Sequence, residues 1–177
     1  GGIRFGLVAI KNIGRGFIQT MMRRREQDGP FRSFQDFCQR MFDCTDMNKR
    51  AVENLIRSGA FDSMKVRRSQ LIQVFEKVLD SIAESRRKNV EGQLDLFGMA
   101  AGDAPPAETP LPDIPEFTAA ERMFMEKETT GLYLSGHPMA DYRAMARQAG
   151  AVPIHTILED FSAEDGPVRF ADGQSIT

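Results

Sequence analysis

Residues 10–16, IKNIGRG, decide how the first part of this chain folds. Two isoleucines alternate with polar and glycine residues, and apolar residues then recur at helical spacing from Phe17 to Met22. Glycine and asparagine tolerate a positive φ better than other residues. We therefore expect a tight turn between two short helices, with Gly14 in its strained part. The first amides of the second helix would point outward, where the helix dipole favours an anion.

A second turn of this kind occurs about 45 residues later, in residues 55–61, LIRSGAF. Both turns resemble the helix-hairpin-helix motif, whose turn reads glycine, hydrophobic residue, glycine. Neither copy is ideal, because Asn12 replaces the usual first glycine and Gly59 is followed by Ala60 and Phe61 without a closing glycine. An ordinary helix C-cap would also explain either turn taken alone.

Two such turns in one basic region predict a paired unit that holds DNA phosphates without reading bases. Residues 1–90 contain 18 Lys and Arg against 10 Asp and Glu, whereas residues 91–177 contain 5 against 15. A solvated helical surface is the alternative explanation for the basic half, and for the run Arg23–Arg25 in particular. The candidate DNA-binding residues are Lys11, Asn12, Ile13, Gly14, Arg15, Gly16, Lys49, Arg50, Ser58, Gly59 and Ala60.

The fold is expected to be mainly α. Ser33 and Asn48 can cap helices, and apolar residues from Leu71 to Ile82 mark a longer helix over roughly 65–88. Five of the nine prolines lie in residues 98–116, which predicts a linker. The sequence Thr118-x-x-Glu121 predicts a capping box and a helix to about 130, and a further helix is expected near 139–148. The expected parts are residues 1–90, residues 91–116 as a flexible segment, and residues 117–177 as a helical linker whose end, PVRFADGQSIT, enters a strand.

Residues 91–98, EGQLDLFG, place three large apolar residues in a segment that otherwise reads as a loop. Burying a Leu or Phe side chain stabilises by roughly 1.5–3 kcal/mol, so such residues are seldom left in a loop without a use. Either Leu94, Leu96 and Phe97 pack back on the chain's own module, or they bind a partner.

Several classes of function are not supported by the sequence. No run of 18 apolar residues predicts a membrane span, and the first residues, GGIRFGLVAI, lack the features of a signal peptide. A cytoplasmic location is therefore expected, and the missing initiator Met predicts a fragment of a longer protein. Cys38 and Cys44 are expected to be reduced packing residues, and His137 and His155 to be structural. We expect no cofactor or metal in this fragment.

The stretches GLVAIKNIGRG, GPFRSFQDFC, NKRAVENLIRSGAFD, QLDLFG and EKETTGLYLSGHP together resemble the alpha-subunit family of bacterial DNA polymerase III, the replicative family C polymerases. The resemblance implies a tandem helix-hairpin-helix module, a segment that binds the sliding clamp (the beta subunit), and a helical linker leading to a downstream OB fold. The clamp-binding residues would be Gln93, Leu94, Asp95, Leu96 and Phe97.

The parent enzyme implied by this resemblance is a DNA-directed DNA polymerase, a nucleotidyltransferase with Mg²⁺ in an upstream palm domain. The fragment itself would carry no catalytic residue and would tether the polymerase to duplex DNA and the clamp. Other polymerase III holoenzyme subunits are further expected partners, and no membrane is.

The sequence argues against two alternative functions. The mutagenic, error-prone paralogue of the same family shares the hairpins but typically lacks a good clamp peptide, so QLDLF argues against it. A helix-hairpin-helix glycosylase needs a catalytic Asp or Lys shortly after its hairpin, and the residues that follow Gly14 supply none.

Overall fold

The computed structural model describes residues 6–92, 108–162 and 169–170. The chain divides into two compact units, Gly1–Ser135 and Gly136–Thr177. Helices and turns make up both units, and no β-strand occurs in the residues described. The mainly α fold expected from the sequence is therefore confirmed.

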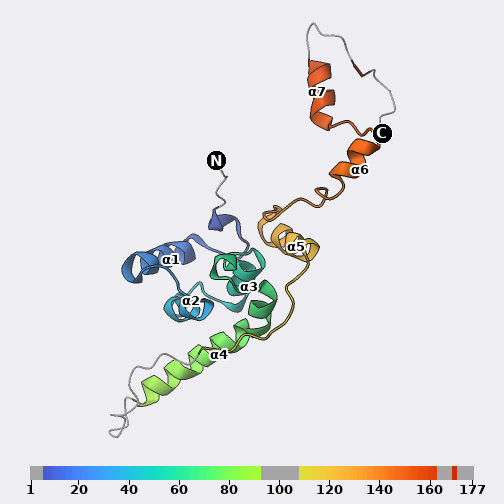
Figure 1. Cartoon of the computed structure of the whole chain (residues 1–177). Helices are drawn as coiled ribbons and strands as arrows, with labels where there is room; N and C mark the ends of the chain where they lie inside the picture. The colour runs from blue at the N-terminus through green and yellow to red at the C-terminus, as the bar shows by residue number, and fades with distance from the viewer. Residues whose placement is uncertain (1–5, 93–107, 163–168, 171–177) are drawn as a thin grey trace. The chain divides into compact units, whose positions relative to one another are not determined.

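Among the residues described, the first unit contains five α-helices, labelled in Figure 1, and two short 3-10 helices. In chain order these are η1 (Leu7–Ala9), α1 (Arg15–Asp28), α2 (Phe34–Met41), α3 (Lys49–Arg57), η2 (Asp62–Met64), α4 (Arg68–Gly92) and α5 (Ala119–Thr130).

The predicted helix boundaries follow from local chemistry. Ser33 Oγ accepts from the Asp36 amide at 3.1 Å, and Asn48 Oδ1 accepts from the Ala51 amide at 2.9 Å. Thr118 and Glu121 form the capping box that opens α5. Each cap satisfies an amide of the first helical turn that has no partner inside the helix.

Aromatic side chains form the centre of the first unit. The Phe37 ring lies 6.4 Å from the Phe17 ring, 5.1 Å from that of Phe31 and 5.0 Å from that of Phe61, measured between centroids. Helix α4 adds the buried residues Leu71, Val74, Phe75, Val78 and Ile82, which closely follow the apolar stripe seen in the sequence. This core fixes the elements on which both hairpins depend.

Residues 108–118, named here the return segment, run without helix or strand before α5, as their proline content predicts. The segment is hydrogen-bonded to α2 and to the start of α4. Gln35 Oε1 accepts from the Thr109 amide at 2.8 Å, and Gln70 Nε2 donates to the Pro112 carbonyl at 2.8 Å. Glu116 accepts from the Arg68 and Ser69 amides at 2.7 and 3.1 Å, so it caps α4 from a distant part of the sequence.

The first compact unit thus includes the return segment and α5, and ends at Ser135. The division at residues 90 and 116 that was expected from composition stays a prediction.

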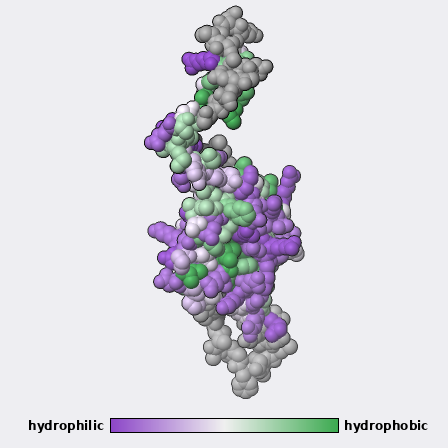
Figure 2. Space-filling model, turned by 90° about the vertical axis from the view of Figure 1, so that its right-hand side faces the viewer, coloured by the Kyte–Doolittle hydropathy of each residue, from purple (hydrophilic) through white to green (hydrophobic). Residues whose placement is uncertain are grey.

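The second unit contains α6 (Arg143–Gln148) and α7 (Ile154–Ser162). Helix α6 is shorter than the predicted 139–148, and α7 was not predicted. Pro153 directly precedes α7, and its carbonyl accepts from the Thr156 amide at 3.0 Å. Ile154, Leu158 and Phe161 are exposed on α7 at helical spacing, and green apolar surface is visible on this unit in Figure 2. The expected strand entry falls outside the described residues, except for Arg169 and Phe170, which form a bend.

Replacing Glu116 by Gln should lower the free energy of unfolding by about 1–2 kcal/mol, because α4 loses a charged acceptor for two of its first-turn amides. Urea unfolding monitored by circular dichroism measures this change. Asp113→Asn is the matched control, since Asp113 is 98% exposed in its pair with Arg67 and should contribute less than about 0.5 kcal/mol. Equal effects of the two changes would contradict the capping role of Glu116.

Candidate nucleic-acid interface

The first hairpin is anchored by two buried isoleucines, Ile10 and Ile13, which are 5% and 7% exposed. Lys11 and Asn12 lie between them and are exposed. Asn12 takes the left-handed conformation, with φ of 63°, as the sequence suggested. The expectation of strained backbone at Gly14 was wrong, because its φ is −80°. Because Asn12 adopts the left-handed conformation, the backbone at Gly14 can be extended.

The backbone of Lys11 is held from two sides. Asn54 of α3 donates from Nδ2 to the Lys11 carbonyl at 2.8 Å. The Lys11 amide donates to the carbonyl of Thr129, in the last turn of α5, at 2.9 Å. Two helices distant in sequence therefore fix the tip of this turn.

The N-terminus of α1 differs from those of the other α-helices described in this unit. Its N-cap is Gly14, which has no side chain to accept a hydrogen bond. The first-turn amides have no acceptor within an α-helix. Side chains cap α2, α3, α4 and α5, whereas no side chain in the described residues accepts from the first turn of α1. Gly14, Arg15 and Gly16 are exposed. The start of α1 therefore offers free donors and a positive dipole end to an external anion.

Basic side chains surround this helix start. Lys11, Arg15 and Arg50 are exposed and form no ion pair with any acid whose placement is described. Arg50 lies one turn before Asn54 on α3, and so on the face that contacts the hairpin. Lys49 is directed elsewhere, since its Nζ lies 3.0 Å from Glu76 and 3.5 Å from Asp80. The hydrogen bond to Glu76 is the main cause that raises the pKa of Lys49.

The carboxylate of Asp46 lies beside the two glycines at this helix start. A Cβ added at Gly16 would lie 2.8 Å from Asp46 Oδ2, and one added at Gly14 would lie 3.9 Å from it. Gly16 therefore leaves room for the Asp46 carboxylate. This negative charge suits the helix dipole but opposes the approach of a phosphate.

The second hairpin uses its amides internally. The amides of Ser58, Gly59 and Ala60 donate to the carbonyls of Asn54, Ile56 and Leu55, each at 3.0 Å. Gly59 has φ of 82° and ends α3, as predicted. DNA contact by Ser58, Gly59 and Ala60 stays a prediction, although the geometry offers a phosphate no free amide among these three.

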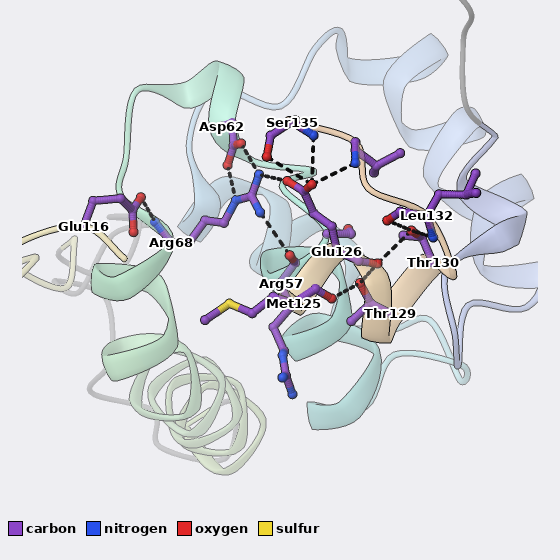
Figure 3. A network of polar contacts seen from close by, with 12 residues as sticks. Arg57, Asp62, Arg68, Glu116, Met125, Glu126, Thr129, Thr130, Leu132 and Ser135 are labelled. Atoms are coloured by element: carbon purple, nitrogen blue, oxygen red, sulfur yellow. Dashed lines mark hydrogen bonds and ion pairs between the residues drawn. The ribbon is translucent and has the colours of Figure 1, made fainter. Parts of the chain in front are cut away.

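The guanidinium of Arg68 occupies the space beside Gly59, and Figure 3 shows its ion pairs with Asp62 and Glu126. A Cβ at Gly59 would lie 2.2 Å from Arg68 Nη2, so the glycine is required by space as well as by φ. Arg68 is 3% exposed and pairs with Asp62 at 2.6 Å and with Glu126 at 2.9 Å. Its Nη1 also donates to the Arg57 carbonyl at 3.2 Å.

Glu126 is fully buried and is the acceptor at the centre of this network. Its Oε2 accepts from the amides of Leu134 and Ser135, each at 2.8 Å, while Oε1 accepts from Arg68. Burial alone would raise the pKa of Glu126, but the amides of Ser135 and Leu134 together with Arg68 outweigh it and lower the pKa. Burial alone would lower the pKa of Arg68, but Asp62 and Glu126 raise it. Both groups are therefore charged at neutral pH.

The other candidate residues from the sequence include the clamp peptide, His137 and the two cysteines. The predicted clamp peptide, Gln93 to Phe97, lies outside the described residues. His137 Nδ1 accepts from the Met139 amide at 3.1 Å, as expected of a structural histidine. Cys38 and Cys44 are free, and burial raises the pKa of the Cys38 thiol. Among the described residues, no His, Cys, Asp and Glu side chains group as metal ligands, and no helix is long and apolar enough to cross a membrane.

Comparison with known proteins agrees with the hairpin geometry. Residues 1–71 match the helix-hairpin-helix motif family. DNA polymerase III subunit alpha of Mycobacterium leprae is 33% identical over 168 residues, or 94% of this chain. The chain is homologous to a segment of the DNA polymerase III alpha subunit. The subunit of Chlamydia pneumoniae is 37% identical over 145 residues, or 80% of this chain, and that of Xylella fastidiosa 32% over 154 residues, or 87%.

The chain spans only 12–14% of the length of these alpha subunits. The matched motif region includes both hairpins, α2 and α3, and ends in the first turn of α4. Asn54, Thr129 and Glu126, which hold the first hairpin and α5 in place, were not identified from the sequence. The sequence did contain one indication that Glu126 is buried, because this acid directly follows three apolar residues, Met123-Phe124-Met125.

Glu126→Gln should lower the free energy of unfolding by about 3 kcal/mol at pH 7, because it breaks a buried ion pair. The pKa of Glu126 is lowered in the folded state, so its stabilisation is present above the unfolded value of about 4.3 and is lost as pH falls through the folded value. The difference between wild type and variant should therefore shrink below about pH 4.

Urea unfolding across this pH range measures the difference. Glu128→Gln is the control, because Glu128 is 48% exposed in its pair with Arg57 and should contribute less than about 0.5 kcal/mol. A difference for Glu126→Gln that stays constant down to pH 3 would show that its charge does not carry the effect.

Proposed function

We propose that the first unit binds duplex DNA through the phosphate backbone, with the first hairpin and the start of α1 as its main contact. The observation that carries this proposal is the uncapped N-terminus of α1, whose glycines and flanking cations are all exposed. Backbone amides and basic side chains contact phosphates without reading bases, so the binding is independent of sequence.

The second hairpin has a different part in this proposal. Its amides are used within α3, and Arg68 fills the space beside Gly59. It contributes surface near Ala60, which is exposed, and supports α3, which carries Arg50 and Asn54. DNA affinity should therefore depend mainly on residues 11–16 and Arg50.

Replacing Lys11, Arg15 and Arg50 together by Ala should weaken binding to a short duplex and reduce the salt dependence of binding. Each lost phosphate contact should reduce the slope of log affinity against log salt by about 0.9. Fluorescence anisotropy at several salt concentrations measures both quantities. A variant with unchanged affinity and slope would place the DNA elsewhere on the molecule.

Asp46→Asn is the matched variant, for which DNA affinity should change in the opposite direction. It removes the carboxylate charge beside the start of α1 while keeping nearly the same shape, so DNA binding should tighten by about twofold to fivefold at low salt. The variant should also lose up to about 1 kcal/mol of stability, because the charge favours the helix dipole.

We further propose that residues 93–97 bind the sliding clamp, as the resemblance to QLDLF peptides suggests. The segment leaves the end of α4 at Gly92, and the chain is attached again at Thr109 through Gln35. Both ends of the peptide region are therefore connected to the DNA-binding unit. A clamp held there stays within a limited distance of the DNA, which raises its effective concentration.

Leu96→Ala combined with Phe97→Ala should abolish binding of the chain to purified clamp, because two apolar side chains of roughly 1.5–3 kcal/mol each are removed from the contact. Surface plasmon resonance on immobilised clamp measures this loss. DNA affinity and melting temperature should stay nearly unchanged. A large fall in melting temperature would instead show that the pair packs on the chain's own core.

The polymerase activity belongs in this proposal to other parts of the parent protein. The fragment is non-catalytic, Mg²⁺ would act in the upstream palm, and the further partners are other holoenzyme subunits in the cytoplasm.

A further inference from the structure

We propose that Glu126 is a positioning residue for DNA binding, because its buried pair with Arg68 sets α5 where the Thr129 carbonyl holds the first hairpin. The inference rests on the proposed function, in which that hairpin contacts DNA. It assigns α5, which follows the clamp-peptide region in sequence, to the DNA-binding site.

The two contacts lie on one face of α5. Glu126 and Thr129 are three residues apart, so they are neighbours on the helix surface. They are 0% and 2% exposed, respectively. The face that pairs with Arg68 therefore also meets the Lys11 amide, and a shift of α5 at one contact moves the other.

The contact between α5 and the hairpin joins two groups that would otherwise lack partners. Thr129 is in the last turn of α5, where backbone carbonyls have no amide donor within the helix. The Lys11 amide lies in a turn and has no helical partner of its own. Their hydrogen bond of 2.9 Å satisfies both groups. Neither group comes from a side chain, so only the placement of α5 can make or break this contact.

The end of α5 is itself fixed around Glu126. Gly131 ends the helix with φ of 79°, and the chain then turns back so that the Leu134 and Ser135 amides reach Glu126 Oε2. Thr130 Oγ1 donates to the Glu126 carbonyl at 2.7 Å. Figure 3 shows these contacts gathered at one end of α5. Loss of the Glu126 charge would loosen the turn that carries Thr129.

The consequence for DNA follows from the short distance in sequence between Lys11 and Gly14. Asn54 holds the Lys11 carbonyl and Thr129 holds its amide, so the turn enters α1 at a fixed angle. Without α5, Asn54 and the two buried isoleucines alone would hold the turn. The phosphate donors at the start of α1 would then be less well oriented.

The test compares Glu126→Gln, Asn54→Ala and the control Ser33→Ala in the full chain. Glu126→Gln and Asn54→Ala should each weaken duplex DNA binding by about fivefold, the equivalent of one hydrogen bond. Ser33→Ala removes the side-chain cap of α2 and takes no part in the contacts of Arg68, Glu126 or Lys11, so it should lower stability but leave DNA affinity unchanged. Hydrogen exchange by NMR should show the Lys11 amide exchanging about tenfold faster in Glu126→Gln, while the α2 amides stay protected.

Normal DNA affinity and normal Lys11 protection in a folded Glu126→Gln variant would overturn the inference. Equal weakening by Ser33→Ala would also overturn it, since general destabilisation would then explain the loss. If Glu126→Gln does not fold, hydrogen exchange of the wild-type protein is the test. The Lys11 amide should then exchange at the same rate as the α5 amides. An unprotected Lys11 amide together with protected α5 amides would contradict the proposal. If wild type does not bind DNA, or the triple Ala variant of Lys11, Arg15 and Arg50 binds as wild type does, the proposed function fails instead.

Discussion

The guanidinium of Arg68 joins the end of α3 and η2 to Glu126 of α5, which lies 58 residues further along the chain. It lies beside Gly59 at the end of α3, pairs with Asp62 at the start of η2 and pairs with the buried Glu126 of α5. Burying these charges costs free energy, which good geometry and further hydrogen bonds offset. Removing one partner leaves an uncompensated buried charge, so the arrangement tolerates little change. The end of α3, the position of α5 and the glycine at residue 59 all depend on this one side chain.

This interaction also explains why two hairpins that look alike in sequence differ in structure. Each turn contains a residue with positive φ, Asn12 in the first and Gly59 in the second. The helix after the first turn begins at an uncapped glycine, whereas α4 after the second turn is capped by Glu116 and begins with the buried Arg68. An anion-binding turn needs free donors and open space. Only the first turn combines these two features in the part of the chain described.

Sequence reasoning predicted what local chemistry determines. The caps at Ser33, Asn48 and Thr118 act within three residues, and the apolar stripe of α4 follows helical periodicity, so both could be read directly. The pairs of Arg68 with Glu126 and of Asn54 with Lys11 join residues 58 and 43 positions apart, and no local pattern encodes them. The error at Gly14 arose because the motif places positive φ at glycine, whereas here Asn12 adopts it and relieves Gly14 of the need.

The basic and acidic halves of the sequence are joined by ion pairs in the first unit. Acids from residues 108–135 do not form a separate acidic part, since several pair with the basic half. Glu128 pairs with Arg57, Asp113 with Arg67 and Glu126 with Arg68. These pairs neutralise the end of α3 and the start of α4, while Lys11, Arg15 and Arg50 have no acidic partner in the described residues. Positive charge without an acidic partner in the described residues is thereby concentrated at the first hairpin, where the free amides of α1 also lie, so the acids make the two turns electrostatically different.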